Sequence, residues 1–460
     1  MSRRRRAQGA PNASGFGPSP SRRAQIGWRG TALLAAAVAP LYGAHLLFGA
    51  NQPMAAQALT ALCGLILIVG LTVPRLRQAL PELKGLWPVA GLFGLFGLVL
   101  AVAAVTLGAG PPGAAHPIWE WAGLPPAISV NRSATLLAMS QLLGLAAMFL
   151  FGAIAGSQRA WGVRLATVIL VGGAIWAAIA LVIFLSGAQV GQAGRLGGGL
   201  LSSNSAATML GILTVLATGW LLRALRESRE LAGPDRVSRI SLAVAPLALL
   251  VFALILTGSR MGALATLAGV LTLGVWQAFA EPGRSWKTLG VAAGVTLIAA
   301  IVVGLGNDLV LRRVAALDQD VDVRSVIFAV HWRAFLDAPL WGSGLGSFTD
   351  VNSYLMSAET YEELWSIRAT HNVYLQWLQE AGLIGSAPMF ALIGLVIMAA
   401  ALRAGTLSRG SWALRALVAA NVVVLVHGLT DFALQVPSIA AMWALLLGVQ
   451  FGFGQVRGRG

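Results

Sequence analysis

The sequence predicts an all-α polytopic membrane protein with about 12 transmembrane helices and a large outer loop that contains amphipathic helices. Hydrophobic residues make up 57% of the 460 residues and charged residues only 11%, which excludes an ordinary soluble domain. Apolar runs of about twenty residues recur along the chain, and this length crosses roughly 30 Å of hydrocarbon. Only one long polar interval, residues 306–381, interrupts these runs.

The first 30 residues are polar and basic, with four arginines in a row at residues 3–6. A cleavable leader needs an apolar core followed by a small-residue cleavage site, whereas here a run long enough to span follows at residues 31–50. We therefore expect a disordered cytoplasmic tail ahead of the first span. The basic run fits contact with anionic lipid, so no nucleic-acid partner is expected. The single cysteine, Cys63, excludes an intrachain disulfide.

The apolar runs divide the chain into four parts. Residues 1–30 form the tail, residues 31–305 the first nine transmembrane helices, residues 306–381 the large outer loop, and residues 382–460 the last three helices with a short cytoplasmic tail. The expected spans are residues 31–50, 53–73, 86–107, 133–155, 165–186, 204–222, 240–257, 262–280, 288–305, 382–402, 411–430 and 437–455.

Basic residues orient this topology. Most of the 32 Lys and Arg residues fall in the tails and in the connectors on the same side as the N-terminus, which predicts that both termini are cytoplasmic. An arginine on the outer side works against this rule, so each one there invites its own explanation. The outer arginines are Arg132, Arg195, Arg260, Arg312, Arg313, Arg324, Arg333 and Arg368.

Three of the outer arginines lie in distinctive segments. Arg195 lies in a Gly-rich loop that leads to Asn204, and Arg260 lies in a short turn, residues 257–262. Arg324 opens an expected amphipathic helix, residues 323–336, where its spacing places it on one face with Phe328, His331 and Phe335. A tight Gly turn, residues 341–348, and a second surface helix, residues 351–366, are expected to follow.

Asp318, Asp320 and Asp322 alternate in the way that begins a calcium loop. That loop also requires Gly at its sixth position and Glu at its twelfth, where this chain has Val323 and Ala329. We therefore expect a solvated acidic turn and no metal site.

Polar residues gather again at the end of the outer loop. Thr370 can cap a helix that begins with His371 and Asn372, which would place the imidazole at the positive end of the helix dipole and keep it neutral. His427 and Asp431 are one helical turn apart near the outer face. They form either a mutually satisfied pair that anchors the helix end or a functional site, since ionisable groups at membrane depth are costly to bury.

These residues resemble the signature of a known family. His371-Asn372, an aromatic-Leu-Gln run and then Glu380-x-Gly-Leu-Ile-Gly resemble the O-antigen ligase and O-antigen polymerase family. Further pieces in the family's order are the Arg195–Asn204 loop, the turn at residues 258–262, the segment 324–348 and the ending at residues 427–437, so the resemblance covers roughly residues 190–450.

The resemblance implies a helical fold related to lipid-dependent glycosyltransferases, in the bacterial inner membrane, with the active site facing the periplasm beneath the outer loop. The implied donor is a glycan linked to a polyprenyl diphosphate, and the acceptor is a glycan or lipid A core in the biosynthesis of O-antigen, lipopolysaccharide or exopolysaccharide. A protein hydroxyl is an alternative acceptor. A secondary transporter is the alternative from another class, although transporters usually place their ionisable sites near the bilayer midplane.

Such a reaction assigns roles to the polar residues. Arg195, Arg260 and Arg324 would bind the donor diphosphate, because arginine stays protonated and offers a bidentate fork; contact with lipid headgroups is the alternative for each. His371 would act as the general base, losing activity below roughly pH 6 as the ring becomes charged. Asn204, Asn372, His427 and Asp431 would support the site or face the acceptor. One-step attack would invert the anomeric centre, and neither a metal nor another cofactor is required.

Overall fold

The computed structural model describes residues 26–106, 108, 110–111, 113–188, 194–280, 317–406 and 412–455. Over these ranges the chain is helical and forms no β-strand, which confirms the predicted fold class. The predicted tail up to residue 25 and the predicted span 288–305 lie outside the described residues.

Nine helices in the described part are long and apolar enough to cross a membrane. They are α2 (Pro53–Thr72), α4 (Leu86–Val105), α6 (Arg132–Ser157), α7 (Arg159–Leu185), α8 (Ser203–Glu227), α9 (Gly233–Leu256), α10 (Arg260–Ala280), α16 (Val373–Thr406) and α18 (Pro437–Gln455). Helices α1 (Trp28–Leu46) and α17 (Trp412–His427) also form where spans were predicted. The predicted number of twelve transmembrane helices is therefore not confirmed by these nine candidate spans.

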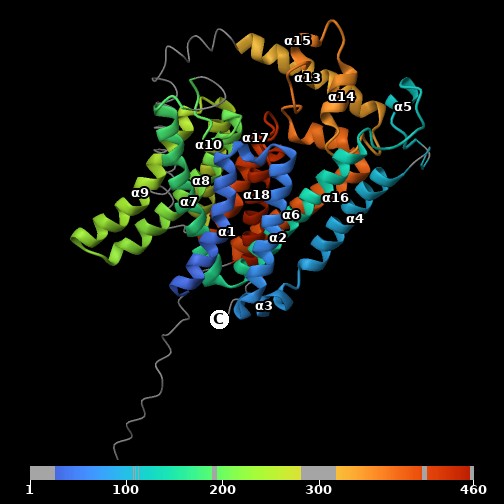
Figure 1. The fold of residues 1–460 in the computed structure, drawn as a ribbon. Coiled ribbons are helices and arrows are strands. Elements are labelled where there is room, and N and C mark those ends of the chain that lie inside the picture. Colours follow the sequence, from blue (N-terminus) through green and yellow to red (C-terminus); the bar gives the residue numbers. More distant parts are fainter. Residues whose placement is uncertain are drawn as a thin grey trace, which may run out of the picture.

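The helices form a bundle with a cap at one end (Figure 1). Helices α13 (Leu317–Asp337), α14 (Phe348–Leu355) and α15 (Tyr361–Leu364) form this cap, whereas the start of α1 and the short helix α3 (Pro74–Ala79) lie at the opposite end. Because consecutive spans alternate in direction, the starts of α8, α10 and α16 and the end of α17 all come to the capped end. Segments far apart in the sequence therefore meet there.

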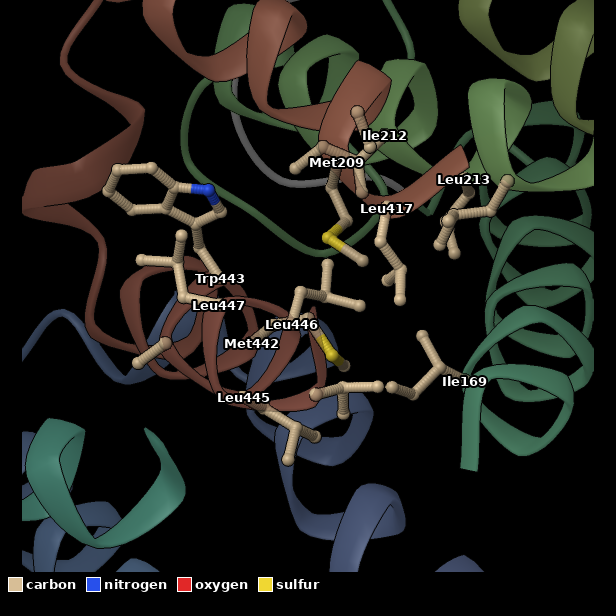
Figure 2. Close-up of a cluster of buried hydrophobic side chains, with 14 of the residues drawn as sticks. Ile169, Met209, Ile212, Leu213, Leu417, Met442, Trp443, Leu445, Leu446 and Leu447 are labelled. Carbon is tan, nitrogen blue, oxygen red and sulfur yellow. The ribbon is translucent and has the colours of Figure 1, made fainter. Parts of the chain in front are cut away.

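Helix α18 lies at the centre of the bundle. Gly448 and Gly452 of α18 face the backbone of α6 at Phe149 and Ala153, so closely that a side chain at either glycine would collide with it. Small residues allow this approach of two backbones. Toward α8 and α17, α18 contributes large apolar residues: Met442 and Leu446 lie near Met209 of α8 and Leu417 of α17 (Figure 2).

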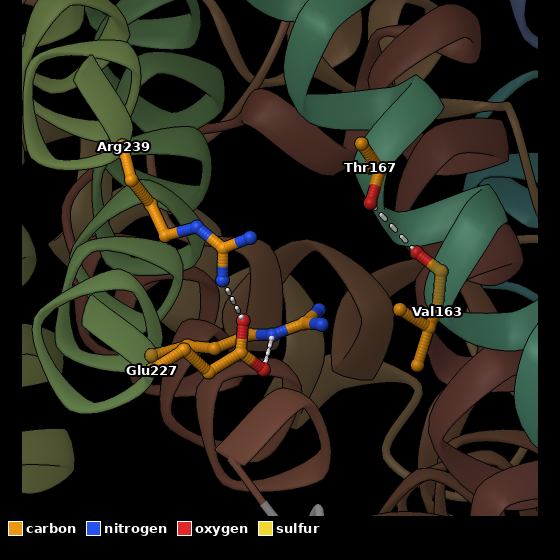
Figure 3. A network of polar contacts seen from close by, with 5 residues as sticks. Val163, Thr167, Glu227 and Arg239 are labelled. Atoms are coloured by element: carbon orange, nitrogen blue, oxygen red, sulfur yellow. Dashed lines mark hydrogen bonds and ion pairs between the residues drawn. The ribbon is translucent and has the colours of Figure 1, made fainter. Parts of the chain in front are cut away.

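Two polar clusters connect helices away from the cap. Within the bundle, Asn421 of α17 donates to Gln450 (2.8 Å) and accepts from the indole of Trp443 (2.9 Å), both on α18. At the end opposite the cap, Glu227 bridges Arg223 of α8 and Arg239 of α9 at 2.7 and 3.2 Å (Figure 3). The side chains of these two ion pairs are 31% to 48% exposed, so the pairs contribute little stability.

The cap differs from the sequence prediction in two places. The expected surface helix over residues 351–366 is wrong: two short helices, α14 and α15, form instead, and Thr360 accepts a hydrogen bond from the backbone of Ser357 between them (3.1 Å). Such side-chain bonds to the backbone compete with helix formation. The expected acidic turn around Asp320 is also wrong, because α13 already begins at Leu317. The predicted helix at residues 323–336 forms within α13.

The Gly turn at residues 341–348 folds against a kink in α16. Backbone amides of Ser343 and Gly344 donate to the carbonyls of Gln379 (2.9 Å) and Glu380 (2.8 Å). The Glu380 carboxylate in turn accepts from the amides of Gly346 (3.0 Å) and Phe348 (3.1 Å). The kink is at Gly382, whose φ of 61° favours glycine. The predicted boundary between the outer loop and the next span, at residues 381 and 382, thus coincides with this kink.

Candidate active site

Helix α16 begins one residue after Asn372, which caps it. The Asn372 side chain accepts hydrogen bonds from the amides of Tyr374 (3.0 Å) and Leu375 (3.1 Å), and the first helical residue is Val373. The Thr370 hydroxyl is used differently, because it donates to the carbonyl of Asn372 (2.6 Å) in a turn ahead of the helix. The prediction that Thr370 caps a helix beginning at His371 is therefore wrong, since the asparagine side chain satisfies the helical amides.

His371 is held between α16 and the end of α17. Its backbone is left-handed, with φ of 55°, and its ring meets the ring of Phe432 edge-on at 4.9 Å. The amide of Val373 donates to the carbonyl of Gly428 (2.9 Å), and the Tyr374 hydroxyl donates to the carbonyl of Leu425 (2.8 Å). These bonds fix the start of α16 on α17. Within the described part of the chain, the buried Nδ1 of His371 has no hydrogen-bond partner.

The His371 ring is neutral at physiological pH. Burial lowers its pKa to about 4, and the positive charge of Arg324 on α13 lowers it further in the same direction. The sequence predicts a neutral ring as well, on the ground of the helix end and of nearby arginines. Desolvation penalises the imidazolium and is the main cause, with the neighbouring arginine second.

His427 and Asp431 do not form the predicted pair. Helix α17 ends at His427, so the chain has turned before it reaches Asp431 and the one-turn spacing no longer brings the two side chains together. No hydrogen bond joins them among the described residues; Nδ1 of His427 instead lies 2.7 Å from the hydroxyl of Thr208 on α8. Both residues are buried, with 1% and 0% exposure.

Asp431 is a buried carboxyl group close to two arginines. Burial raises its pKa to about 6, while the amides of Phe432 and Ala433 and the charges of Arg324 and Arg195 oppose this increase. Its two oxygens lack a well-aligned hydrogen-bond partner in the ranges that the structure describes. A carboxyl group with such a pKa is mainly ionised at neutral pH, and it balances part of the arginine charge.

Arg195 connects the Gly-rich loop to two helices. Its Nε donates to the carbonyl of Thr257 (2.7 Å), and its Nη2 donates to the side chain of Asn204 at the start of α8 (2.8 Å). The loop itself is fixed by a hydrogen bond from the indole of Trp176 to the carbonyl of Gly198 (2.9 Å). The guanidinium therefore has a defined position, and Asn204 is its direct partner.

Arg260 is the first residue of α10, in the turn that also contacts Arg195. The Ser259 side chain accepts from the amide of Gly262 (3.2 Å) and so caps α10. Gly262 packs so closely on Ala207 of α8 that a side chain there would collide. An arginine at the positive end of a helix is unfavourable by itself, and an anion bound there would relieve this.

The capped end thus gathers most of the predicted site residues. The charge of Arg324 acts on His371, His427 and Asp431, and that of Arg195 acts on Asp431. Asn204 accepts a hydrogen bond from Arg195, and Arg260 lies in the turn that begins with Thr257, the other partner of Arg195. Asn372 instead caps the start of α16.

Sequence reasoning missed two residues of this cluster, Thr208 and Phe432. Thr208 follows Asn204 by one helical turn, so the spacing in α8 could have indicated it. Nothing local indicates Phe432, whose ring meets His371 only in the folded chain.

An apolar cavity of about 660 Å³ opens beside this cluster. Helices α4, α6, α16, α17 and α18 line it with apolar and aromatic side chains and without any charged one. At the capped end its wall includes Val373, Tyr374 and Gly428, which adjoin His371 and His427. Toward the other end of the bundle it reaches Leu86 of α4 and Ala401 of α16. The cavity therefore runs along most of the length of the bundle.

Residues 245–390 match the family model described as O-antigen ligase. The matched segment contains Arg260, Arg324 and His371, and it ends before His427 and Asp431. No curated protein matches the chain.

Proposed function

We propose that this chain transfers a glycan from a polyprenyl diphosphate to a sugar hydroxyl. The match of residues 245–390 to the O-antigen ligase family supports a glycosyltransferase-like role in surface polysaccharide biosynthesis. The observation that carries this proposal is that the charges of Arg324 and Arg195 both act on the buried Asp431, and that the charge of Arg324 also acts on the neutral His371. Fixed positive charge suits a diphosphate leaving group, and a neutral imidazole suits a base.

Arg195, Arg260 and Arg324 bind the diphosphate of the donor in this proposal. Arg195 is preorganised by its bonds to Thr257 and Asn204, and Arg260 begins α10 in the same turn. A preorganised donor costs no reorganisation when charge develops on the leaving group. The hydrocarbon chain of the donor then lies in the apolar cavity, which begins beside His371 and has the composition of a lipid site.

Transfer is a single displacement. As the acceptor hydroxyl oxygen attacks the anomeric carbon, the imidazole of His371 removes the hydroxyl proton. The bond between the anomeric carbon and the diphosphate oxygen breaks, and its electron pair leaves with the polyprenyl diphosphate, whose charge the arginines stabilise. One displacement inverts the anomeric centre, and arginine supplies the charge neutralisation that a metal provides in many phosphate enzymes.

Asp431 and His427 support these groups. When no donor is bound, the Asp431 carboxylate balances the charge of Arg324 and Arg195; a bound diphosphate takes over that role. Thr208 holds the ring of His427, which lies within reach of the charge of Arg324. In this proposal the protein lies in the bacterial inner membrane. The site faces the periplasm, and both termini lie in the cytoplasm.

The test is a reaction of purified protein in lipid vesicles with a synthetic polyprenyl-diphosphate-linked sugar and a sugar acceptor. We expect release of polyprenyl diphosphate, a product with inverted anomeric configuration and full activity in the presence of EDTA. Retention of configuration would contradict the single displacement, and loss of activity with EDTA would contradict metal independence.

The acceptor is determined in cells that lack the protein. Accumulation of single-repeat lipid-linked intermediates identifies a polymerase, whereas accumulation of finished lipid-linked chains identifies a ligase. If lipid-linked glycans accumulate and only protein glycosylation is lost, the acceptor is a protein hydroxyl.

A further inference from the structure

Helix α13 carries Arg324 into the site from the cap. His331 follows Arg324 by two helical turns, so both side chains lie on the same face of α13. This face is the buried one, because Ile327 and Phe335 along it are 1% and 6% exposed. The contacts that hold this face of α13 against the bundle therefore also set the position of Arg324.

His331 makes the directional contacts of this face. Its ring is fully buried; Nδ1 lies 2.8 Å from Oε1 of Gln379 on α16, and Nε2 lies 3.2 Å from Oδ1 of Asn352 on α14. The ring of Phe348 covers it with 4.8 Å between centroids. Gln379 belongs to the same helix that begins beside His371. One side chain thus connects the helix that carries Arg324 to the helix that positions the base.

The hydrogen bonds around His331 determine which of its two ring nitrogens carries the proton. The side-chain amide of Asn352 donates to the carbonyl of Leu364 (2.9 Å), which directs its Oδ1 toward His331, so Nε2 of His331 must carry a hydrogen. Burial lowers the pKa of His331, and a neutral ring then accepts at Nδ1. The NH₂ group of Gln379, whose Nε2 is buried and unpartnered in the present orientation, is the donor available if the amide is reversed.

Apolar packing alone would not fix α13 in this way. Ile327, Phe348, Leu364 and Ile367 form a small cluster under the helix. Such contacts are non-directional and tolerate rotation or sliding of the helix. A buried polar network that is fully satisfied favours one arrangement, because any other leaves its members without partners.

We propose that His331 is a positioning residue that holds Arg324 against His371 and Asp431 by connecting α13 to α14 and α16. The consequence for catalysis rests on the proposed function. His371 is acted on by the charge of Arg324 from α13, and its ring contacts Phe432 from the segment after α17. Of these, only Arg324 depends on the placement of α13.

The first test measures the geometry without activity. In full-length protein with Cys63→Ala, the pair Arg324→Cys and His371→Cys is joined with a short bis-maleimide in lipid vesicles. Adding His331→Leu should reduce the cross-linking yield several-fold, whereas adding His116→Leu, which removes another buried histidine outside the cap helices, should not. An unchanged yield in the His331→Leu protein would overturn the proposal.

The second test measures the pH profile of transfer. It is made in an Asp431→Asn background, because Arg324 also lowers the pKa of Asp431. A cation disfavours the imidazolium, so displacement of Arg324 raises the pKa of His371, and the acidic limb should move to higher pH both in His331→Leu and in Arg324→Ala. The rate at neutral pH should fall by roughly 10²-fold, as expected for a misplaced catalytic group. His331→Gln, which retains hydrogen bonding, should recover part of the rate and of the shift.

The double variant separates positioning from a general loss of structure. If His331 acts through Arg324, His331→Leu with Arg324→Ala should be no slower than Arg324→Ala alone. Fully additive losses would overturn the proposal. A reduced cross-linking yield with an unchanged acidic limb would leave the positioning role standing and would contradict His371 as the base, so the two proposals fail in different ways.

Discussion

His371 occupies a backbone conformation that most residues avoid. Its φ of 55° lies in the left-handed region, which costs free energy for a residue with a side chain. The surroundings impose it: Thr370 and Asn372 are bonded on either side, and the next amide, Val373, is tied to α17. Strain of this kind occurs often at active sites. Here it turns the ring away from the helix and toward Phe432.

Substitution of His371 distinguishes a base from a structural contact. His371→Ala should reduce transfer by about 10²–10⁴-fold, the usual loss when a general base is removed. His371→Gln keeps hydrogen bonding but cannot accept the proton at neutral pH, so it should be as inactive as the alanine variant. Rates are measured in purified protein with lipid-linked donor, and a fully active Gln variant would exclude His371 as base.

The pH dependence follows from the two unusual pKa values. A base must be neutral to act, and the pKa of His371 is lowered to about 4, so activity should persist well below the value of roughly 6 expected from sequence. A limb near pH 6 would come from Asp431, whose pKa is raised to about 6. The rate of transfer is measured from pH 4 to pH 8. Such a limb should disappear in Asp431→Asn; if it remains, Asp431 is not its source.

Arg260 should depend on the shape of its side chain as well as on its charge. Arg260→Lys retains the charge but loses the bidentate fork, so we expect a large decrease in glycan transfer with normal membrane insertion. Arg260→Ala should be at least as damaging. Arg333→Ala, at an exposed outer arginine on α13, is the matched control and should transfer normally. Near-normal transfer by Arg260→Ala would remove Arg260 from the site.

Among the elements, α16 does more than span the membrane. Its first turns, before Gly382, contact the cap formed by α13–α15 and the Gly turn beside it. Gln379 binds His331, and Glu380 accepts hydrogen bonds from the amides of Gly346 and Phe348. Both parts of the helix line the apolar cavity, the first turns through Val373, Tyr374 and Trp377 and the longer part after Gly382 through residues between Met389 and Ala401. The segment before the kink therefore contacts the polar cap and the cavity at the same time.

The placement of the elements across the membrane is tested with reporter fusions. A reporter that is active only outside the cytoplasm should be active after Asp350 in α14 and silent after Arg229, between α8 and α9. The reason is the concentration of basic residues in the connectors at the α8–α9 end. Activity on the same side for both fusions would contradict the proposed topology.

At the scale of the whole molecule, the polar site and the apolar cavity adjoin at one end of the bundle. Gly428 illustrates this: its carbonyl accepts from the amide that follows Asn372, and it also lines the cavity. A lipid with a charged head and a long apolar chain could occupy both regions without leaving the bilayer. This combination distinguishes the molecule from a transporter with an ionisable site at the midplane.

Filling the cavity should weaken donor binding. Gly394 lines it and has open space around its Cβ position, so Gly394→Trp places an indole in the path of the hydrocarbon chain. Each buried methylene contributes about 0.8 kcal/mol, so displacement of two should raise the KM for donor roughly 10-fold. Gly405→Trp, on the same helix and also in open space but outside the cavity wall, is the control. An equal effect of both variants would contradict the assignment.

The fold class of the molecule, and the gathering of its unusual residues at one end of the bundle, could be predicted from the sequence alone. Apolar length is a local property that adds along the chain, so the spans of α2, α4 and α6 could be predicted without knowledge of any contact. Alternation of the spans then requires that segments as distant as the Arg195 loop and the His371 turn reach the same end.

The tertiary structure decided what those residues touch. The partner of His427 is Thr208, 219 residues away, in place of Asp431. Asn372 caps α16 in place of Thr370, because docking on Gly428 sets where the helix begins. The low pKa of His371 and the raised pKa of Asp431 both come from burial, and burial depends on which helices surround a group. These properties belong to contacts between distant residues, which no local pattern in the chain specifies.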